Sequence, residues 1–240
     1  MNGFESTYTR NQTSFTPLVN KDRDYLLTIP YKGLSLTEPV RIFHIGRDYA
    51  VFQLPNSRVC AALKDRVYLR TPESGKTIIA SVEEVNFQRG WLTLCSFLPG
   101  RSEWRDRRSE RVQTSLPVRV RLQCHHYECY GTLDDLSIHG LGVLLYHVDD
   151  FKVPVEVGEK VHLEFKLPAV ARPLRVDGTL IGMQSASKKL SRVGFHISPS
   201  RLHLNMLNKF IQQRRIELIT ELELIWMQTQ EPRSSKDLYF

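Results

Sequence analysis

The sequence lacks any long apolar run. None of its hydrophobic stretches approaches the roughly 20 residues that a membrane-spanning helix needs, and the N-terminal MNGFESTYTRNQTSF has no apolar core of the signal-peptide kind. We therefore expect a soluble, cytoplasmic protein.

Cysteine is scarce. Four cysteines in 240 residues are too few and too scattered for a disulfide scaffold, so we expect reduced thiols. The stretch CHHYEC at 124–129 has the residue types of zinc ligands. A structural zinc site usually takes two pairs of ligands from separate places, whereas this cluster lies where a hairpin turn belongs. We expect no metal and no redox cofactor.

Catalytic motifs are also lacking. The sequence contains no nucleophile elbow, Walker loop or dinucleotide-binding glycine motif, and its histidines show no pairing. Asp134 and Asp135 are adjacent, and adjacent residues of a strand point to opposite faces. Shared acid–base chemistry by these carboxylates is therefore disfavoured, and we expect no enzymatic activity.

Positive charge, in contrast, is abundant. The formal net charge is +7, and such an excess attracts phosphates and acidic surfaces. The hydrophobic content of 41% indicates folded material, and the length suits two modest domains. The partner is expected to be anionic, although charge alone does not name it.

Short runs rich in aliphatic and β-branched residues recur over residues 21–100, after a flexible arm at 1–20. They are YLLTI, VRIFHI, YAVFQL, RVYLR, TIIASVEEV and WLTLCSF, separated by turn-prone pieces such as LTEP, IGRD, LPNS, PESGK and QRG. Gly, Pro, Asn and Asp supply the dihedral angles of tight turns. This spacing predicts an antiparallel barrel or sandwich.

A second domain is predicted at residues 113–228, and it begins with another series of strands. Val118, Val120 and Leu122 alternate with arginines, as in a half-buried strand. The runs GTLDDLS, GLGVLLYHV, KVHLEFKLP, PLRVDGTLIGMQ and SRVGFHIS continue the series. The sequence therefore predicts a mainly β protein with two barrel domains.

The pattern becomes helical at Ser200, a residue suited to capping a helix. Apolar residues then recur at steps of three, four and seven, namely Leu207, Phe210, Ile211, Leu218, Leu222 and Ile225. This predicts an amphipathic helix packed on the second barrel, followed by a flexible tail at 229–240.

The stretch RDRRSERVQTSLPV concentrates arginine at the boundary between the two β-rich halves. Arg107 and Arg111 stand four positions apart, just before an LPV that begins a strand. A solvated charged linker would account for this stretch by itself. We interpret residues 101–112 as an interdomain switch segment because of a second pattern, described next.

That second pattern is DLSIHG, which places Asp135, Ser137 and Gly140 before a strand. By itself it is ordinary hairpin chemistry, with side chains bonding to the backbone of the turn. Together the two patterns are specific. They resemble the PilZ family of cyclic di-GMP receptors, whose signature is RxxxR entering a six-stranded barrel and [DN]xSxxG on an adjacent strand. The resemblance covers residues 105 to about 215. The β-rich half in front is similar to the two-domain YcgR type, in which a split barrel precedes the PilZ barrel.

This resemblance implies cyclic di-GMP as the ligand. The implied binding residues are Arg107, Arg108, Arg111, Asp135, Ser137, Gly140 and Gly142. The chemistry agrees, because a guanidinium can bond guanine O6 and N7, hold a phosphate or stack on a purine. Asp135 can accept the N1–H and N2–H of guanine, Ser137 can bond a base or phosphate, and Gly140 lets the backbone approach.

The resemblance further implies an output. A ligand-ordered linker would change the arrangement of the domains, in the manner of a flagellar brake acting on motor or switch proteins at the basal body, or would control a related surface or biofilm process. The alternatives are a ligand-free PilZ-like interaction module and a non-specific nucleic-acid binder. The sequence leaves open the roles of Arg105, Asp106 and Arg108, the number of ligands bound, and whether the chain forms a homodimer.

Overall fold

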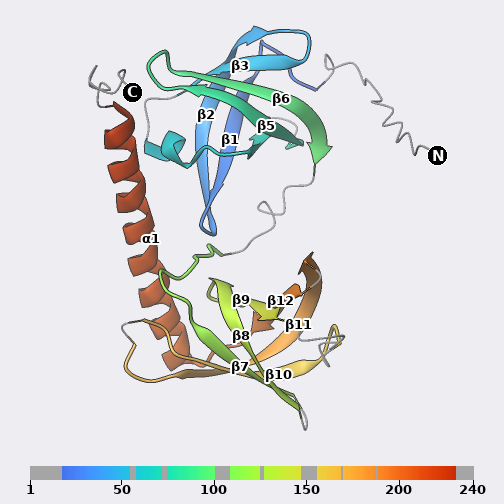
Figure 1. Ribbon diagram of the computed structural model, residues 1–240, viewed down its shortest axis with the longest axis vertical. Helices are drawn as coiled ribbons and strands as arrows, with labels where there is room; N and C mark the ends of the chain where they lie inside the picture. Colours follow the sequence, from blue (N-terminus) through green and yellow to red (C-terminus); the bar gives the residue numbers. More distant parts are fainter. Residues whose placement is uncertain are drawn as a thin grey trace, which may run out of the picture. The chain divides into compact units, whose positions relative to one another are not determined.

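The protein folds into two compact units, each built on a closed antiparallel β-barrel (Figure 1). The computed structural model describes residues 18–54, 58–71, 75–100, 109–124, 127–146, 156–168, 170–187 and 189–230. Within these residues the architecture is mainly β, with two six-stranded barrels and one C-terminal α-helix. The predicted fold class is confirmed.

The first barrel contains six strands in the order β1-β2-β3-β6-β5-β4. They are β1 (Asp24–Tyr31), β2 (Leu34–Ile45), β3 (Tyr49–Gln53), β4 (Arg66–Arg70), β5 (Thr77–Asn86) and β6 (Trp91–Gly100), with a short 3-10 helix η1 (Arg58–Ala62) before β4. Alternate residues of β1, from Tyr25 to Tyr31, are buried. This period of two places one face of the strand in the core.

One turn of the first barrel differs from the prediction. The turn-prone LTEP at 36–39 lies inside β2, so the expectation of a break there is wrong. The chain reverses earlier, at Lys32 and Gly33, whose φ angles are 45° and 92°. A two-residue hairpin with positive φ at both positions matches the twist of its strands, and this turn takes the place of the predicted one.

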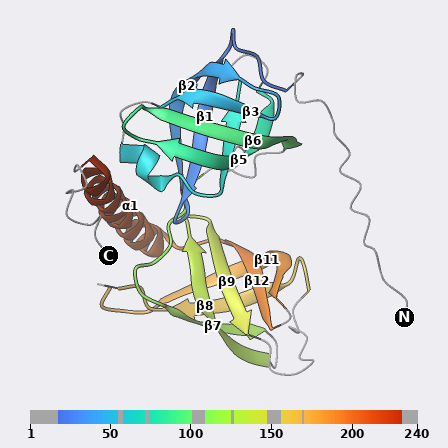
Figure 2. The same ribbon diagram turned by 45° about the horizontal axis from the view of Figure 1, so that its top comes forward.

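The second barrel has the strand order β10-β11-β12-β9-β8-β7. Its strands are β7 (Arg119–Cys124), β8 (Tyr127–Leu136), β9 (Gly140–Tyr146), β10 (Lys160–Phe165), β11 (Leu174–Ser187) and β12 (Leu190–Ile197). In Figure 2, β8 and β9 lie side by side, and β12 follows on the other edge of β9. The barrel interior is filled by aliphatic and phenylalanine side chains such as Val120, Val143, Leu163 and Phe195.

The helix α1 (Arg201–Gln230) follows directly after the second barrel. The hydroxyl of Ser200 accepts from the backbone N–H of His203 at 3.3 Å, which is the expected N-terminal cap. Four of the six predicted apolar positions are fully buried, namely Leu207, Ile211, Leu218 and Leu222, whereas Phe210 and Ile225 are half-buried. Among the described residues, no helix has the length and apolarity to cross a membrane.

Candidate ligand-binding site

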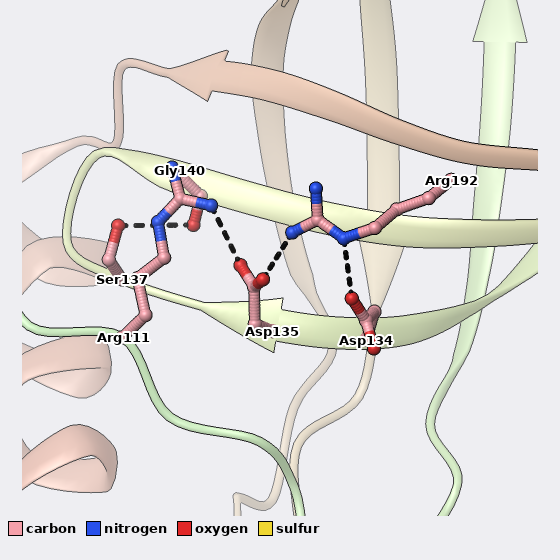
Figure 3. A network of polar contacts seen from close by, with 6 residues as sticks. All are labelled: Arg111, Asp134, Asp135, Ser137, Gly140 and Arg192. Carbon is pink, nitrogen blue, oxygen red and sulfur yellow. Dashed lines mark hydrogen bonds and ion pairs between the residues drawn. The ribbon is translucent and has the colours of Figure 1, made fainter. Parts of the chain in front are cut away.

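The two sequence patterns meet in the second unit, as Figure 3 shows. Arg111 reaches the site from the segment before β7, Asp135 lies near the end of β8, and Gly140 begins β9. Arg107 and Arg108 lie outside the described residues, as do Arg105 and Asp106. The structure therefore brings together Arg111 and the residues of DLSIHG.

The segment that carries Arg111 is held by its backbone. Val112 forms a two-bond bridge with Leu136, with both N–H···O distances at 2.9 Å, and the Val112 side chain is fully buried. The carbonyl of Gln113 accepts from Nε of Arg214 on α1 at 2.9 Å. These bonds place the Arg111 side chain beside β8 and β9.

Asp135 is the centre of the site. Nη1 of Arg111 donates to its Oδ1 at 3.1 Å, and Nη2 of Arg192 donates to its Oδ2. The two guanidiniums reach the carboxylate from opposite sides in Figure 3. Only 10% of the Asp135 side chain is exposed, so this charge needs its partners, because a buried charge is costly unless it is paired.

Arg192, on β12, was missed by the sequence analysis. It bridges two carboxylates, since its Nε also donates to Oδ2 of Asp134 at 2.6 Å. Burial acts to lower the pKa of Arg192, but the hydrogen bonds and negative charges of the two aspartates outweigh this effect and raise the pKa. The alternation of polar and apolar residues in SRVGF predicts that Arg192 points outward. It does not predict that Arg192 binds Asp134 and Asp135.

Asp134 and Asp135 do not behave as residues of a regular strand. The expectation that they would be separated on opposite faces is wrong, because both bind Arg192. The pairing of β8 with β9 shifts register between Leu133 and Asp135. Such a bulge bends the strand and redirects its side chains, which lets neighbouring carboxylates reach one cation.

Ser137 and Gly140 shape the turn between β8 and β9. The backbone N–H of Ser137 donates to the carbonyl of Gly140 at 2.8 Å, and its hydroxyl donates to the same oxygen at 3.3 Å. A Cβ on Gly140 would lie 2.9 Å from the Ser137 hydroxyl and 3.4 Å from Nη2 of Arg111. The turn therefore requires a glycine next to the arginine, and Ser137 is buried within it.

Gly142 makes room for the ion pair. A Cβ there would lie 2.7 Å from Nη2 of Arg192 and 3.1 Å from the Asp135 carboxyl group. The site thus consists of two arginines and two aspartates in close contact, over a backbone without side chains at Gly142. Its chemistry is hydrogen bonding and charge recognition.

The CHHYEC stretch is divided between two strands. Cys124 ends β7, and its thiol donates to Oε1 of Glu159 at 2.9 Å. Cys129 lies on β8, directly opposite Leu122 of β7. His125 and His126 lie outside the described residues. Within the part of the chain that the structure describes, no three His, Cys, Asp or Glu side chains are placed to hold a metal ion.

Residues 105–213 match the family model for the PilZ domain. This part of the chain is a PilZ domain. The PilZ domain contains the whole network, from Arg111 to Arg192, and it ends inside α1. No curated protein sequence matches the chain.

Three solved structures illustrate what the chain is similar to. The inhibitor of motility MotI/DgrA of Bacillus subtilis is 14% identical, with a TM-score of 0.41 over 83% of this chain and 99% of that one. YcgR of Escherichia coli in complex with c-di-GMP is 16% identical, with a TM-score of 0.42 over 84% and 88%. The K. pneumonia MrkH–c-di-GMP complex is 8% identical, with a TM-score of 0.45 over 83% and 90%.

Proposed function

We propose that the protein is a cyclic di-GMP receptor without catalytic activity, which binds its ligand at Arg111, Asp135 and the neighbouring residues of the PilZ domain. The observation that carries the proposal is the contact between Arg111 and Asp135, which joins the arginine pattern to the DxSxxG pattern. Arg107, Arg108, Ser137, Gly140 and Gly142 complete the proposed set.

The ligand suits this pair because it can replace both partners at once. Its phosphates, or guanine O6 and N7, can accept from Arg111, and the N1–H and N2–H of guanine can donate to Asp135. A simple anion would bind Arg111 but offer Asp135 no donor in its place, so Asp135 would keep only its bond to Arg192. A group that offers both an acceptor and a donor edge therefore exchanges partners with the pair and leaves neither charge uncompensated.

We further propose that ligand binding acts through the switch segment at 101–112. Arg111 and Val112 end this segment, and the bonds of Val112 and Gln113 tie this end of it to β8 and α1. A ligand that draws on Arg111 can bias the conformation of the chain preceding it, as ligands do when they order a segment. By its resemblance to the YcgR type, the proposed output is control of flagellar motility through motor proteins at the basal body.

Titration calorimetry with three ligands tests the function. Cyclic di-GMP should bind the purified protein, while the linear guanine dinucleotide and short duplex DNA should bind much more weakly at physiological salt. Binding of DNA with a steep loss of affinity as salt rises would instead support a nucleic-acid binder. Absence of binding to all three ligands would support a PilZ domain that acts only through protein contacts.

A further inference from the structure

A row of glycines continues outward from Asp135 across the second barrel. Asp135 pairs with Gly142 on β9, Gly142 pairs with Gly194 on β12, and Gly194 pairs with Gly182 on β11. Residues directly opposite each other in a sheet share a face. The row therefore forms a strip of bare backbone on the same face as the Asp135 carboxylate.

Side-chain packing explains the glycine at position 142 but does not require glycine at positions 182 and 194. Gly142 accommodates Arg192 and Asp135, as described above. A Cβ on Gly182 would meet nothing within 4 Å, and a Cβ on Gly194 would make only ordinary contacts, the nearest at 3.6 Å to the side chain of Ile181.

Backbone conformation does not require glycine at these two positions either, because neither appears among the glycines with positive φ. Glycine weakens a strand interior and marks either a bulge, such as the register shift between Leu180 and Gly182, or a place where a ligand approaches closely. No register shift lies at Gly194 in its pairing with β9.

A cavity of about 240 Å³ lies at the Gly194–Gly182 end of this strip. Its lining includes Gly182 and Gly194, with Arg111 and Arg192 from the ion-pair network and Ile181 and Gln184 of β11. Pockets that enclose a drug-sized ligand occupy roughly 300 to 1,000 Å³. The cavity is thus smaller than a site for a whole dinucleotide and suits one planar group of it.

We propose that Gly182 and Gly194 form the floor on which one guanine base of the ligand lies. The base would rest flat on the peptide groups, with an edge toward Asp135 and the guanidiniums of Arg111 and Arg192. The flat floor favours a planar, aromatic group. The charges of the arginines and aspartates alone do not distinguish a planar ligand from a non-planar one. The inference rests on the proposed cyclic di-GMP function and assigns a position within that site.

Substitutions at the floor separate binding from folding. Gly182→Ala places a methyl group in open space, and Gly194→Ala places one at ordinary contact distance from Ile181. The thermal unfolding midpoint should therefore stay the same or rise in both variants, because alanine is the less costly residue in a strand interior. Affinity for cyclic di-GMP, measured by calorimetry, should fall by about tenfold or more, because a methyl group lifts the base from its contacts. Gly182→Val should lower the affinity further.

Thr179→Val is the matched control. It places a valine on the same strand, β11, outside the lining of the cavity, and it should bind like the wild type. If the wild type and Thr179→Val bind alike and Arg111→Ala binds more weakly, wild-type affinity in both glycine variants overturns the floor while leaving the receptor function intact. If the wild type itself does not bind cyclic di-GMP, the proposed function fails first.

Discussion

Nη1 of Arg111 donates to Oδ1 of Asp135 at 3.1 Å, across 24 residues of sequence. The arginine side chain is 21% exposed and the aspartate side chain 10%, so this pair is poorly screened by solvent compared with a surface ion pair. Arg111, a proposed ligand-binding residue, is therefore already bonded to an acceptor of the same site. A ligand must offer better partners than the two residues offer each other.

Removal of the Arg111 guanidinium should weaken cyclic di-GMP binding. A good bidentate arginine contact contributes roughly 1 to 3 kcal/mol, so Arg111→Ala should lower the affinity by about fivefold to 150-fold. Calorimetry measures this change. Arg175→Ala is the control, because Arg175 is exposed on β11 and pairs with Glu164 away from the site. If Arg111→Ala and Arg175→Ala bind cyclic di-GMP with equal affinity, Arg111 does not contribute to ligand binding.

Arg192 should determine which base is bound. Its Nη2 donates to Oδ2 of Asp135, and its Nε donates to Oδ2 of Asp134, which fixes the position of the guanidinium. In Arg192→Gln the Asp135 carboxylate loses this support. The affinity for cyclic di-GMP should therefore fall more than the affinity for cyclic di-AMP, whose base lacks the N1–H and N2–H donors. We expect the affinity ratio of cyclic di-GMP to cyclic di-AMP to fall by about tenfold.

A purely general role of the Arg192 charge predicts a different result. It would weaken both cyclic dinucleotides by the same factor and leave the ratio unchanged. Arg175→Gln removes a similar charge from the same barrel and controls for the change in net charge, and it should leave both affinities as they are in the wild type.

Asp135 should also support the stability of the barrel. Asp135→Ala leaves the partly buried guanidinium of Arg111 without its acceptor, which should lower the free energy of unfolding by about 1 to 3 kcal/mol. Urea unfolding measures this difference. Asp177→Ala, at an aspartate whose side chain is 71% exposed, should change stability by no more than about 0.5 kcal/mol. An equal cost at both positions would show that the network adds nothing to the fold.

Cys124 should make the stability depend on pH in alkaline solution. Burial, and then the hydrogen bond to Glu159 and its charge, raise the pKa of this thiol from 9.0 to about 11. The folded protein therefore binds the thiol proton more tightly than the unfolded chain does. The stabilisation is complete below pH 9 and is lost as the pH rises toward 11.

The variant Cys124→Ser isolates this contribution. Serine keeps a hydroxyl that can donate to Glu159 but does not titrate in this range. Unfolding measured at pH 8, 9 and 10 should show a smaller loss of stability in the variant than in the wild type. Parallel losses in both proteins would assign the pH dependence to other groups.

The strands were readable from the sequence because their hydrophobic pattern is local. Alternate residues of β1 and β7 are apolar and buried, and the repeat of α1 predicted the burial of Leu207 and Leu218. The turn at Lys32 and Gly33 was less readable. Nothing in LTEP excludes a strand once its neighbours supply hydrogen-bond partners, and those neighbours are distant in sequence.

The sequence by itself determined the mainly β class, the C-terminal helix and the two motifs of the candidate site, because side-chain period and residue spacing are properties of neighbouring residues. Only the tertiary structure decided that Arg192 joins Asp134 to Asp135, and that Gly182, Gly194 and Gly142 form one row. These relationships depend on strand order and register in a closed barrel. A bulge of one residue in β8 changes which side chains meet, and no local pattern records it.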